Sequence, residues 1–170
     1  IGDKVKAGSP LFFDKYNATV NFCSPVSGEI TDIVRGEKRR ILEIVINSDT
    51  EIAYESFPIA TADSLSREQI IDNMLKAGVW PFIRQKPYDI IANPIDLPKA
   101  IFISTFKSAP LSIDNNFALY GMDELFQKGL DYIVKLTKGK THLNIDGNTN
   151  PSKIFTEAKG VEINTVSGSH

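Results

Sequence analysis

The sequence predicts a β plus α/β chain: an all-β domain over residues 1–58, followed by an α/β domain with a parallel sheet over residues 59–170. Three observations predict this division. Short apolar runs alternate with glycine and proline turns before Pro58, the apolar period lengthens to that of a helix after it, and strands then alternate with helices. A length of 170 residues, 42% of them hydrophobic, suffices for one domain or two small ones with buried cores.

Three short strands are predicted at the start, in residues 2–8 (GDKVKAG), 11–14 (LFFD) and 24–30 (SPVSGEI). The glycines stand where turns need a positive φ, and Pro25 fixes φ before the next turn. Val20 and Phe22 alternate with polar neighbours, which predicts one buried face, and residues 41–46 (ILEIVI) form a β-branched strand after a polar hairpin tip. The pattern resembles a biotinyl/lipoyl-like hammerhead, a small β-sandwich. Because the chain starts inside this pattern, we expect a fragment that lacks the beginning of this domain.

A connection over residues 50–62 leads to the second domain, and Pro58 marks the boundary. Ser66 and Gln69 form a capping box, in which each side chain can serve the other's backbone N–H. Four apolar residues follow at helical spacing, and Gly78 ends this helix. These four are Ile70, Ile71, Met74 and Leu75.

Strands are predicted at residues 99–104, 141–145 and 161–166, with helices at 122–134 and 151–159 between them. We expect Gly139 to be the C′ residue of the longer helix. The same helix carries an apolar stripe at helical spacing, which consists of Met122, Leu125, Phe126, Gly129, Leu130, Ile133 and Val134. This alternation predicts a Rossmann-like parallel sheet with right-handed crossovers. We expect the domain to be truncated at its end.

Composition excludes several classes of function. A net charge of −2 and a pI near 5.7 give no case for binding nucleic acid. Cys23 is the single cysteine, so no internal disulfide is possible, and we expect it to be a small buried side chain. His142 and His170 have no ligands at metal spacing, and no apolar run reaches the roughly 18 residues of a membrane span.

The α/β domain lacks the loops that bind nucleotides. There is no G-x-G and no complete G-x-x-x-x-G-K-[ST] sequence, so neither a dinucleotide nor a P-loop site is expected. Lys15, in a hairpin at residues 14–17, is placed like the modified lysine of a lipoyl or biotin carrier, but a solvated turn lysine is favoured. A second basic tip, with Arg35 and residues 38–40, could contact anionic lipid, although a solvated hairpin is again favoured.

An aromatic segment at residues 78–89 (GVWPFIRQKPYD) is predicted to be non-helical. Its aromatic side chains Trp80, Phe82 and Tyr88 either pack over a sheet edge or line an apolar groove, with Arg84 as a polar handle. Phe102 and Phe106 stand at the end of the next predicted strand, where ligands of α/β sheets bind.

Four segments together resemble one family: residues 2–40, 78–89, 98–111 and 126–140. They are similar to the A subunit of the bacterial sodium-translocating NADH:quinone oxidoreductase. That resemblance implies a peripheral subunit on the cytoplasmic side of the inner membrane, whose partners are the other subunits, chiefly a membrane subunit. It implies distant kinship with the flavin- and NADH-binding subunit of complex I, whose glycine-rich flavin loop is replaced here by residues 78–81.

The same resemblance implies that this chain carries no cofactor, the flavins and the iron–sulfur centre being held by other subunits. It links the subunit loosely with quinone access, which we assign to residues 80–88 and 102–107, namely Trp80, Phe82, Arg84, Phe102 and Phe106 with Lys107. No catalytic residue and no NADH dehydrogenase activity are expected of the fragment alone. The alternative left open is a stand-alone carrier or nucleotide-binding module.

Overall fold

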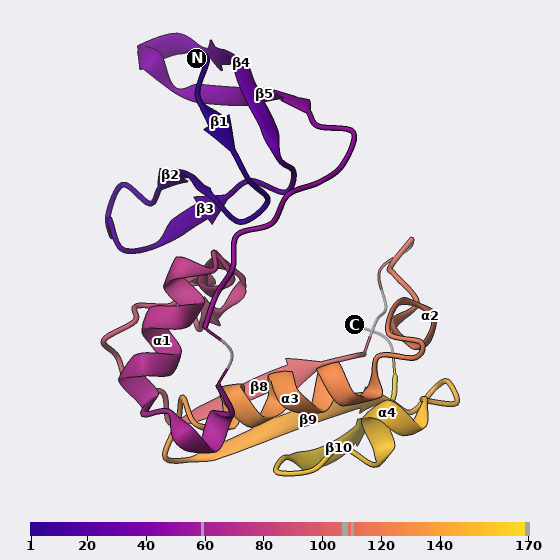
Figure 1. The fold of residues 1–170 in the computed structure, drawn as a ribbon. Helices are drawn as coiled ribbons and strands as arrows, with labels where there is room; N and C mark the ends of the chain where they lie inside the picture. The colour runs from indigo at the N-terminus through magenta and orange to yellow at the C-terminus, as the bar shows by residue number, and fades with distance from the viewer. Residues whose placement is uncertain (59, 107–108, 110, 169–170) are drawn as a thin grey trace. The chain divides into compact units, whose positions relative to one another are not determined.

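The computed structural model describes residues 1–58, 60–106, 109 and 111–168 (Figure 1). The chain forms two compact units. One comprises the described residues of Ile1–Ile59 and Ile71–Pro94, and the other those of Ala60–Ile70 and Ile95–His170. A domain boundary near residue 58 stays a prediction, since the segment 71–94 belongs to the unit that also holds the N-terminal strands.

The first unit is all-β in its N-terminal part, as predicted. β4 (Gly28–Arg35) pairs antiparallel with both β1 (Lys4–Val5) and β5 (Ile41–Ser48), and β2 (Pro10–Phe13) and β3 (Asn21–Cys23) form an antiparallel hairpin. Val20 is 1% exposed and anchors the interior. Gly28 is required, because a Cβ at this position would collide with the carbonyl oxygen of Asn47.

The first helix begins as the sequence predicts. α1 (Arg67–Lys76) follows a short 3-10 turn, η2 (Ala62–Ser64). The Ser66 N–H donates to Gln69 Oε1 at 2.8 Å, and the Gln69 N–H donates to Ser66 Oγ at 3.3 Å, so the capping box is reciprocal. Gly78 adopts φ +69° just after the helix, which confirms its role in ending it.

The aromatic segment differs from the prediction. Instead of being non-helical throughout, it starts with a 3-10 turn, η3 (Trp80–Phe82), in which Pro81 occupies an early position where no N–H is needed. A small antiparallel hairpin of β6 (Arg84–Gln85) and β7 (Ile90–Ile91) follows. These two-residue strands are too short to show an apolar period, so they were not predictable from the local pattern.

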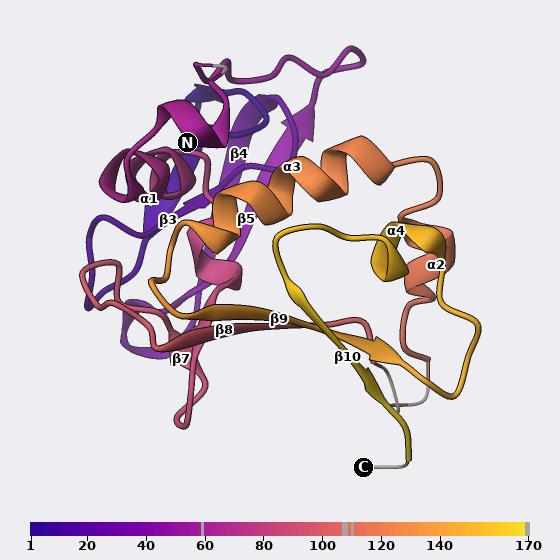
Figure 2. The same ribbon diagram turned by 90° about the horizontal axis from the view of Figure 1, so that it is seen from below.

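The second unit contains the predicted parallel sheet. β8 (Ala100–Ser104), β9 (Lys140–Asp146) and β10 (Glu162–Val166) are ordered β10-β9-β8, all parallel (Figure 2). α3 (Asp123–Val134) connects the first two strands and α4 (Lys153–Thr156) the last two. A short helix that was not predicted, α2 (Asn115–Ala118), precedes α3 and is capped by the Asp114 carboxylate.

One face of this sheet forms the core of the second unit. Leu143 and Ile145 of β9 pack with Ile154 and Phe155 of α4, and Phe126 of α3 joins them through an edge-to-face contact with Phe155 at 5.4 Å. Both helices therefore cover the face that carries the odd-numbered strand residues. The even-numbered residues lie on the opposite face.

Two expectations for the α/β part need correction. The second predicted helix, over residues 151–159, is only one turn, because Ser152 is its N-cap and Glu157 its C-cap. Gly139 is not a helix cap: α3 ends at Val134, five residues earlier. Gly139 stands instead where β9 approaches β8, and any Cβ there would collide with the carbonyl oxygen of Lys99.

Candidate functional site

The predicted aromatic site divides into a buried part and an exposed part. Trp80 is 3% exposed, and its indole Nε1 donates to the carbonyl oxygen of Ala92 at 2.7 Å, which ties η3 to the end of the β6–β7 hairpin. Phe82 is 83% exposed. Of the two rings, only that of Phe82 is available to a ligand or a partner in this unit.

Arg84 is engaged within its own hairpin. Its guanidinium donates to the backbone carbonyl of Asp89, and its Nε lies 3.9 Å from Asp89 Oδ1. The Lys86 ammonium hydrogen-bonds the same carboxylate at 2.9 Å and is the main cause that lowers the pKa of Asp89. Arg84 thus closes a charged turn, and Tyr88 beside it is exposed.

Phe102 and Phe106 belong to the second unit, whereas Trp80, Phe82 and Arg84 belong to the first. Phe102 is 69% exposed in the middle of β8. Phe106 is half-buried just after that strand, and its N–H donates to Ser104 Oγ at 3.2 Å. Lys107, which was predicted with them, lies outside the described residues. The assignment of these five aromatic and basic residues to a quinone site stays a prediction.

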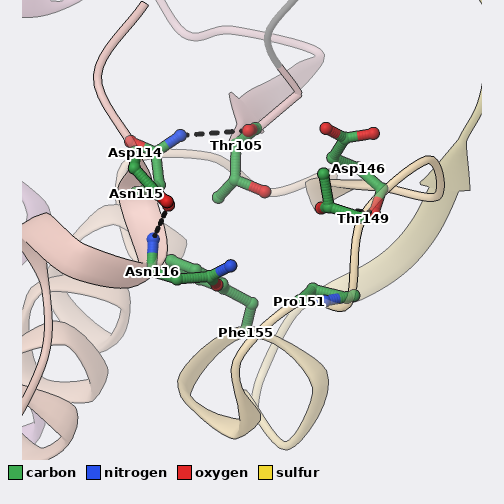
Figure 3. A pocket seen from close by; sticks show the side chains of 8 residues that line it. All are labelled: Thr105, Asp114, Asn115, Asn116, Asp146, Thr149, Pro151 and Phe155. Atoms are coloured by element: carbon green, nitrogen blue, oxygen red, sulfur yellow. Dashed lines mark hydrogen bonds between the residues drawn. The ribbon is translucent and has the colours of Figure 1, made fainter.

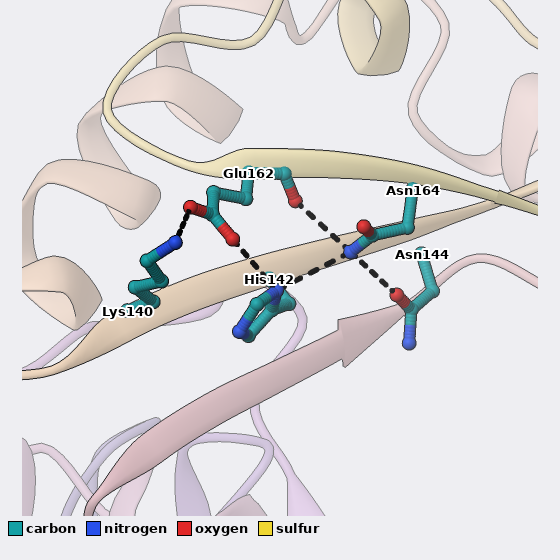
Figure 4. Close-up of polar contacts among 5 residues, drawn as sticks. All are labelled: Lys140, His142, Asn144, Glu162 and Asn164. Atoms are coloured by element: carbon teal, nitrogen blue, oxygen red, sulfur yellow. Dashed lines mark hydrogen bonds and ion pairs between the residues drawn. The ribbon is translucent and has the colours of Figure 1, made fainter.

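The exposed face of the parallel sheet carries a cluster of polar side chains and one aromatic ring, and Figure 4 shows the polar residues around His142. The Phe102 ring stacks on the His142 imidazole, with centroids 4.8 Å apart and planes 10° from parallel. His142 Nδ1 lies 3.4 Å from Glu162 Oε2 and 3.3 Å from Asn164 Nδ2. These contacts hold the His142 imidazole between the Phe102 ring and the side chains of β10.

Two further residues complete this cluster. Asn164 Nδ2 also donates to Asn144 Oδ1 at 3.2 Å, and Lys140 forms an ion pair with Glu162 Oε1. The hydrogen bond from Lys140 is the largest cause that lowers the pKa of Glu162, so the carboxylate is ionised at neutral pH. The five polar side chains therefore join β9 to β10 across the face, and the Phe102 ring supplies a flat apolar surface beside them.

This cluster was not predicted from the sequence. Lys140, His142 and Asn144 alternate with Thr141, Leu143 and Ile145 along β9, and that period of two was the available signal for an exposed polar face. The register of Glu162 beside His142 and of Asn164 beside Asn144 is a tertiary property.

A small hollow lies at the carboxyl ends of β8 and β9, the place where parallel sheets bind ligands (Figure 3). Asn115 Nδ2 donates across it to the Thr105 carbonyl at 3.0 Å, and Asp114 caps α2. The described residues leave about 10 Å³ there, enough for one water molecule, whereas sites for small organic ligands occupy several hundred Å³. As it stands, the hollow does not hold a nucleotide or a quinone. Its lining consists of Thr105, Asp114, Asn115, Asn116, Asp146, Thr149, Pro151 and Phe155.

A larger, apolar hollow of about 400 Å³ lies in the first unit, between the β2–β3 hairpin and β5. The rings of Phe12 and Phe22 stack at 4.7 Å on its wall. Cys23 also lines it and is half-buried rather than buried as expected. Burial raises the pKa of its thiol, which favours the protonated form.

Three further features concern the turn that contains Lys15, the clustering of metal ligands and the length of the helices. Lys15 is exposed in the β2–β3 turn, which the Asp14 carboxylate holds by accepting from the Tyr16 and Asn17 N–H groups. Over the described ranges, no three His, Cys, Asp or Glu residues gather as a metal site would require. Nor does any helix in that part of the chain have the length and hydropathy to cross a bilayer.

Comparison with known proteins gives consistent matches over both units. The family described as the NqrA N-terminal barrel-sandwich hybrid domain matches residues 1–49, and the NqrA second alpha/beta domain matches residues 65–170.

Similar proteins include the A subunit of the Na(+)-translocating NADH-quinone reductase of Yersinia pseudotuberculosis serotype O:1b (strain IP 31758), which is 34% identical over 99% of this chain and 40% of its own length. The proteins of the same name from Photorhabdus laumondii and Saccharophagus degradans are 37% and 32% identical over 84% and 100% of this chain. The matches cover 32% and 38% of those two proteins. The chain thus spans about 32–40% of the length of these relatives.

Proposed function

Because this chain belongs to the NqrA family, we propose that it is part of a peripheral subunit of a Na(+)-translocating NADH-quinone reductase and lies on the cytoplasmic side of the bacterial inner membrane. The observation that carries this proposal is the pair of successive family matches, one over residues 1–49 and the other over residues 65–170. The first match covers the all-β part of the fold and the second covers the α/β part, in the same order along the chain. The subunit docks on membrane subunits of the complex and adds no redox centre of its own.

The finer fold assignments belong to the same proposal. The N-terminal strands form a biotinyl/lipoyl-like hammerhead, and the parallel sheet is Rossmann-like without its nucleotide loop. Two features support the second point: the chain has no G-x-G sequence, and η3 places Pro81, which has no N–H, where a phosphate loop would need free amides. The flavins and the iron–sulfur centre then reside in other subunits.

Within this proposal, the exposed aromatic rings are the parts that help to form a quinone site. A quinone head is flat and apolar with two carbonyl acceptors, so it suits aromatic walls with a few donors. Phe82 of the first unit is 83% exposed and Phe102 of the second unit is 69% exposed, so each offers such a wall within its own unit, and buried Trp80 supports the turn that presents Phe82. Arg84 stays in the proposal with Phe82, and Phe106 with Phe102.

Photocrosslinking of the full-length subunit in the assembled complex tests the proposal. A benzoylphenylalanine in place of Phe82 should capture another subunit or a quinone analogue. The same residue in place of Phe117, which is 84% exposed on α2, serves as a control for exposure alone. Two results together would contradict the proposal: neither position crosslinks to another subunit, and the chain purifies apart from the complex.

The carrier alternative has its own measurement. Lys15 is exposed in a turn, as a modified lysine must be, but exposure is also the usual state of a lysine. Intact mass of the protein purified from its native host decides between the two. The proposed function predicts the unmodified mass, whereas a lipoyl or biotinyl increment mapped to Lys15 would establish the carrier.

A further inference from the structure

The tip of the β4–β5 hairpin concentrates positive charge in a chain whose net charge is −2. Four cations stand within six residues: Arg35, Lys38, Arg39 and Arg40. Glu37 is the one carboxylate among them, and all five side chains are exposed. The charge of this tip is therefore opposite in sign to that of the chain as a whole.

Most of these cations are available to an external partner. In the part of the chain that the structure describes, no carboxylate forms an ion pair with Lys38, Arg39 or Arg40. The tip is held by its backbone, with the Gly36 N–H donating to the Arg40 carbonyl at 2.8 Å. Arg35 Nη1 donates to the Arg39 carbonyl at 3.2 Å, which leaves its other N–H groups free of that bond.

Apolar surface continues directly from the basic tip. Ile41 and Leu42 follow Arg40 and are 40% and 56% exposed. Both line the apolar hollow that also contains the stacked Phe12 and Phe22 rings. A contiguous apolar patch rimmed by charge marks an interaction surface rather than an ordinary solvated hairpin.

We propose that this hairpin tip docks on the surface of an anionic lipid bilayer. The four cations meet lipid phosphates, and Ile41 and Leu42 enter the headgroup region, in the manner of interfacial segments that combine basic and apolar side chains. Near an anionic leaflet, each lysine or arginine raises partitioning about fivefold. The docking depends only on residues of this unit, so it stands or falls separately from membership of the reductase complex.

Flotation with protein-free vesicles tests the proposal on the 170-residue chain. The chain should float with vesicles of phosphatidylcholine and phosphatidylglycerol, not with phosphatidylcholine alone, and added salt should weaken the binding. The double variant Lys38→Asn, Arg39→Asn should lose about 25-fold in partitioning, since two charges are removed. Asparagine suits these positions, because both have a left-handed φ, +54° and +61°, that it tolerates well.

Matched controls separate the tip from general charge. The double variant Lys4→Gln, Lys6→Gln removes the same charge from the same unit. Lys4 lies opposite Glu29 in the β1–β4 register, near the end of β4 that is remote from the tip. We therefore expect less than about a twofold loss of partitioning. For the apolar part, Leu42→Ser should weaken binding, whereas Ile113→Ser, at a 66% exposed side chain of the second unit, should not.

Three results would overturn the docking proposal. One is the absence of flotation with phosphatidylglycerol vesicles at low salt. Another is an equal loss in the Lys4/Lys6 control, which would mean that binding reports net charge alone. The third is stronger retention on immobilised polyglutamate than on the vesicles, abolished by the Lys38/Arg39 variant, which would assign the tip to an acidic protein surface.

Discussion

The indole Nε1 of Trp80 donates a 2.7 Å hydrogen bond to the carbonyl oxygen of Ala92, across twelve residues of chain. The bond joins the start of η3 to the strand end that closes the β6–β7 hairpin. Because Trp80 is also buried, its ring and its N–H both contribute to the placement of the intervening residues 81–91. The position of exposed Phe82 depends on this anchor.

Two substitutions of Trp80 should separate its ring from its hydrogen bond. Trp80→Phe keeps much of the buried area but leaves the Ala92 carbonyl unpaired, which should cost about 1 kcal/mol in the free energy of unfolding. Trp80→Ala also removes the ring and should cost about 3–5 kcal/mol. Urea denaturation measures both. As control, Phe82→Ala should change the free energy of unfolding by no more than about 0.5 kcal/mol; a loss as large as that of Trp80→Ala would show that Phe82 is part of the core.

A second prediction concerns α3, whose apolar stripe is buried unevenly. Leu130 is 2% exposed, whereas Leu125 is 66% exposed. Leu130→Asp would bury a carboxylate without a partner and should prevent folding, and the milder Leu130→Ala should cost about 2–5 kcal/mol. Leu125→Asp should fold with nearly the parent melting temperature. Circular dichroism with thermal melts checks the pair, and equal effects of the two aspartates would contradict the burial described for α3.

A third prediction uses two glycines with similar backbone angles. Gly78 and Gly121 have φ of +69° and +74°, but a Cβ at Gly78 would lie 2.5 Å from the Cys23 Sγ, whereas one at Gly121 would meet nothing within 4 Å. Gly121→Ala should therefore cost about 1 kcal/mol, from backbone strain alone. Gly78→Ala should cost more, and Cys23→Ala should partly restore it in the double variant. Denaturation of all four proteins completes the cycle, and the absence of coupling would place Cys23 away from Gly78.

Local patterns predicted those parts of the fold that local interactions specify. The reciprocal bonds of Ser66 and Gln69 follow from a spacing of three residues, and the stripe from Met122 to Val134 placed α3 to within one residue. The alternation of strands and helices was sufficient to predict the parallel sheet, because a helical crossover between consecutive strands allows few other topologies. The exposure of Leu125 was not predictable, since it lies at the margin of the stripe and depends on how far the sheet extends.

The features that the sequence did not reveal depend on contacts between distant segments. The cluster on the sheet face requires β10 to pair with β9 so that Glu162 lies beside His142, a register that no local pattern encodes. Likewise, the pattern of residues 78–89 does not distinguish a buried Trp80 from an exposed Phe82. The burial of the indole and its hydrogen bond to Ala92, which lies beyond the segment, make Trp80 the structural residue of the two.

The last prediction concerns the pH dependence of the Lys140–Glu162 contact. The hydrogen bond from Lys140, followed by the charges of Lys140 and His142, lowers the pKa of Glu162 in the folded state, with desolvation acting in the opposite direction. In the unfolded chain a glutamate titrates near its ordinary value of about 4.3. Glu162 therefore contributes stability fully above that unfolded pKa, and the contribution is lost as the pH falls through the lower, folded pKa.

The stability difference between the parent and Glu162→Gln should accordingly be largest at neutral pH and shrink in acid. Carboxyl ¹³C NMR should give Glu162 a midpoint below that of an ordinary glutamate, and Lys140→Met should raise it, because the principal cause of the shift is then removed. His142→Phe keeps the stack on Phe102 but removes the weaker charge, so it should raise the midpoint less than Lys140→Met does. A midpoint that is unchanged in Lys140→Met would mean that the ammonium does not hold the carboxylate in solution. The polar link between β9 and β10 would then rest on the contacts that His142 and Asn144 make with β10.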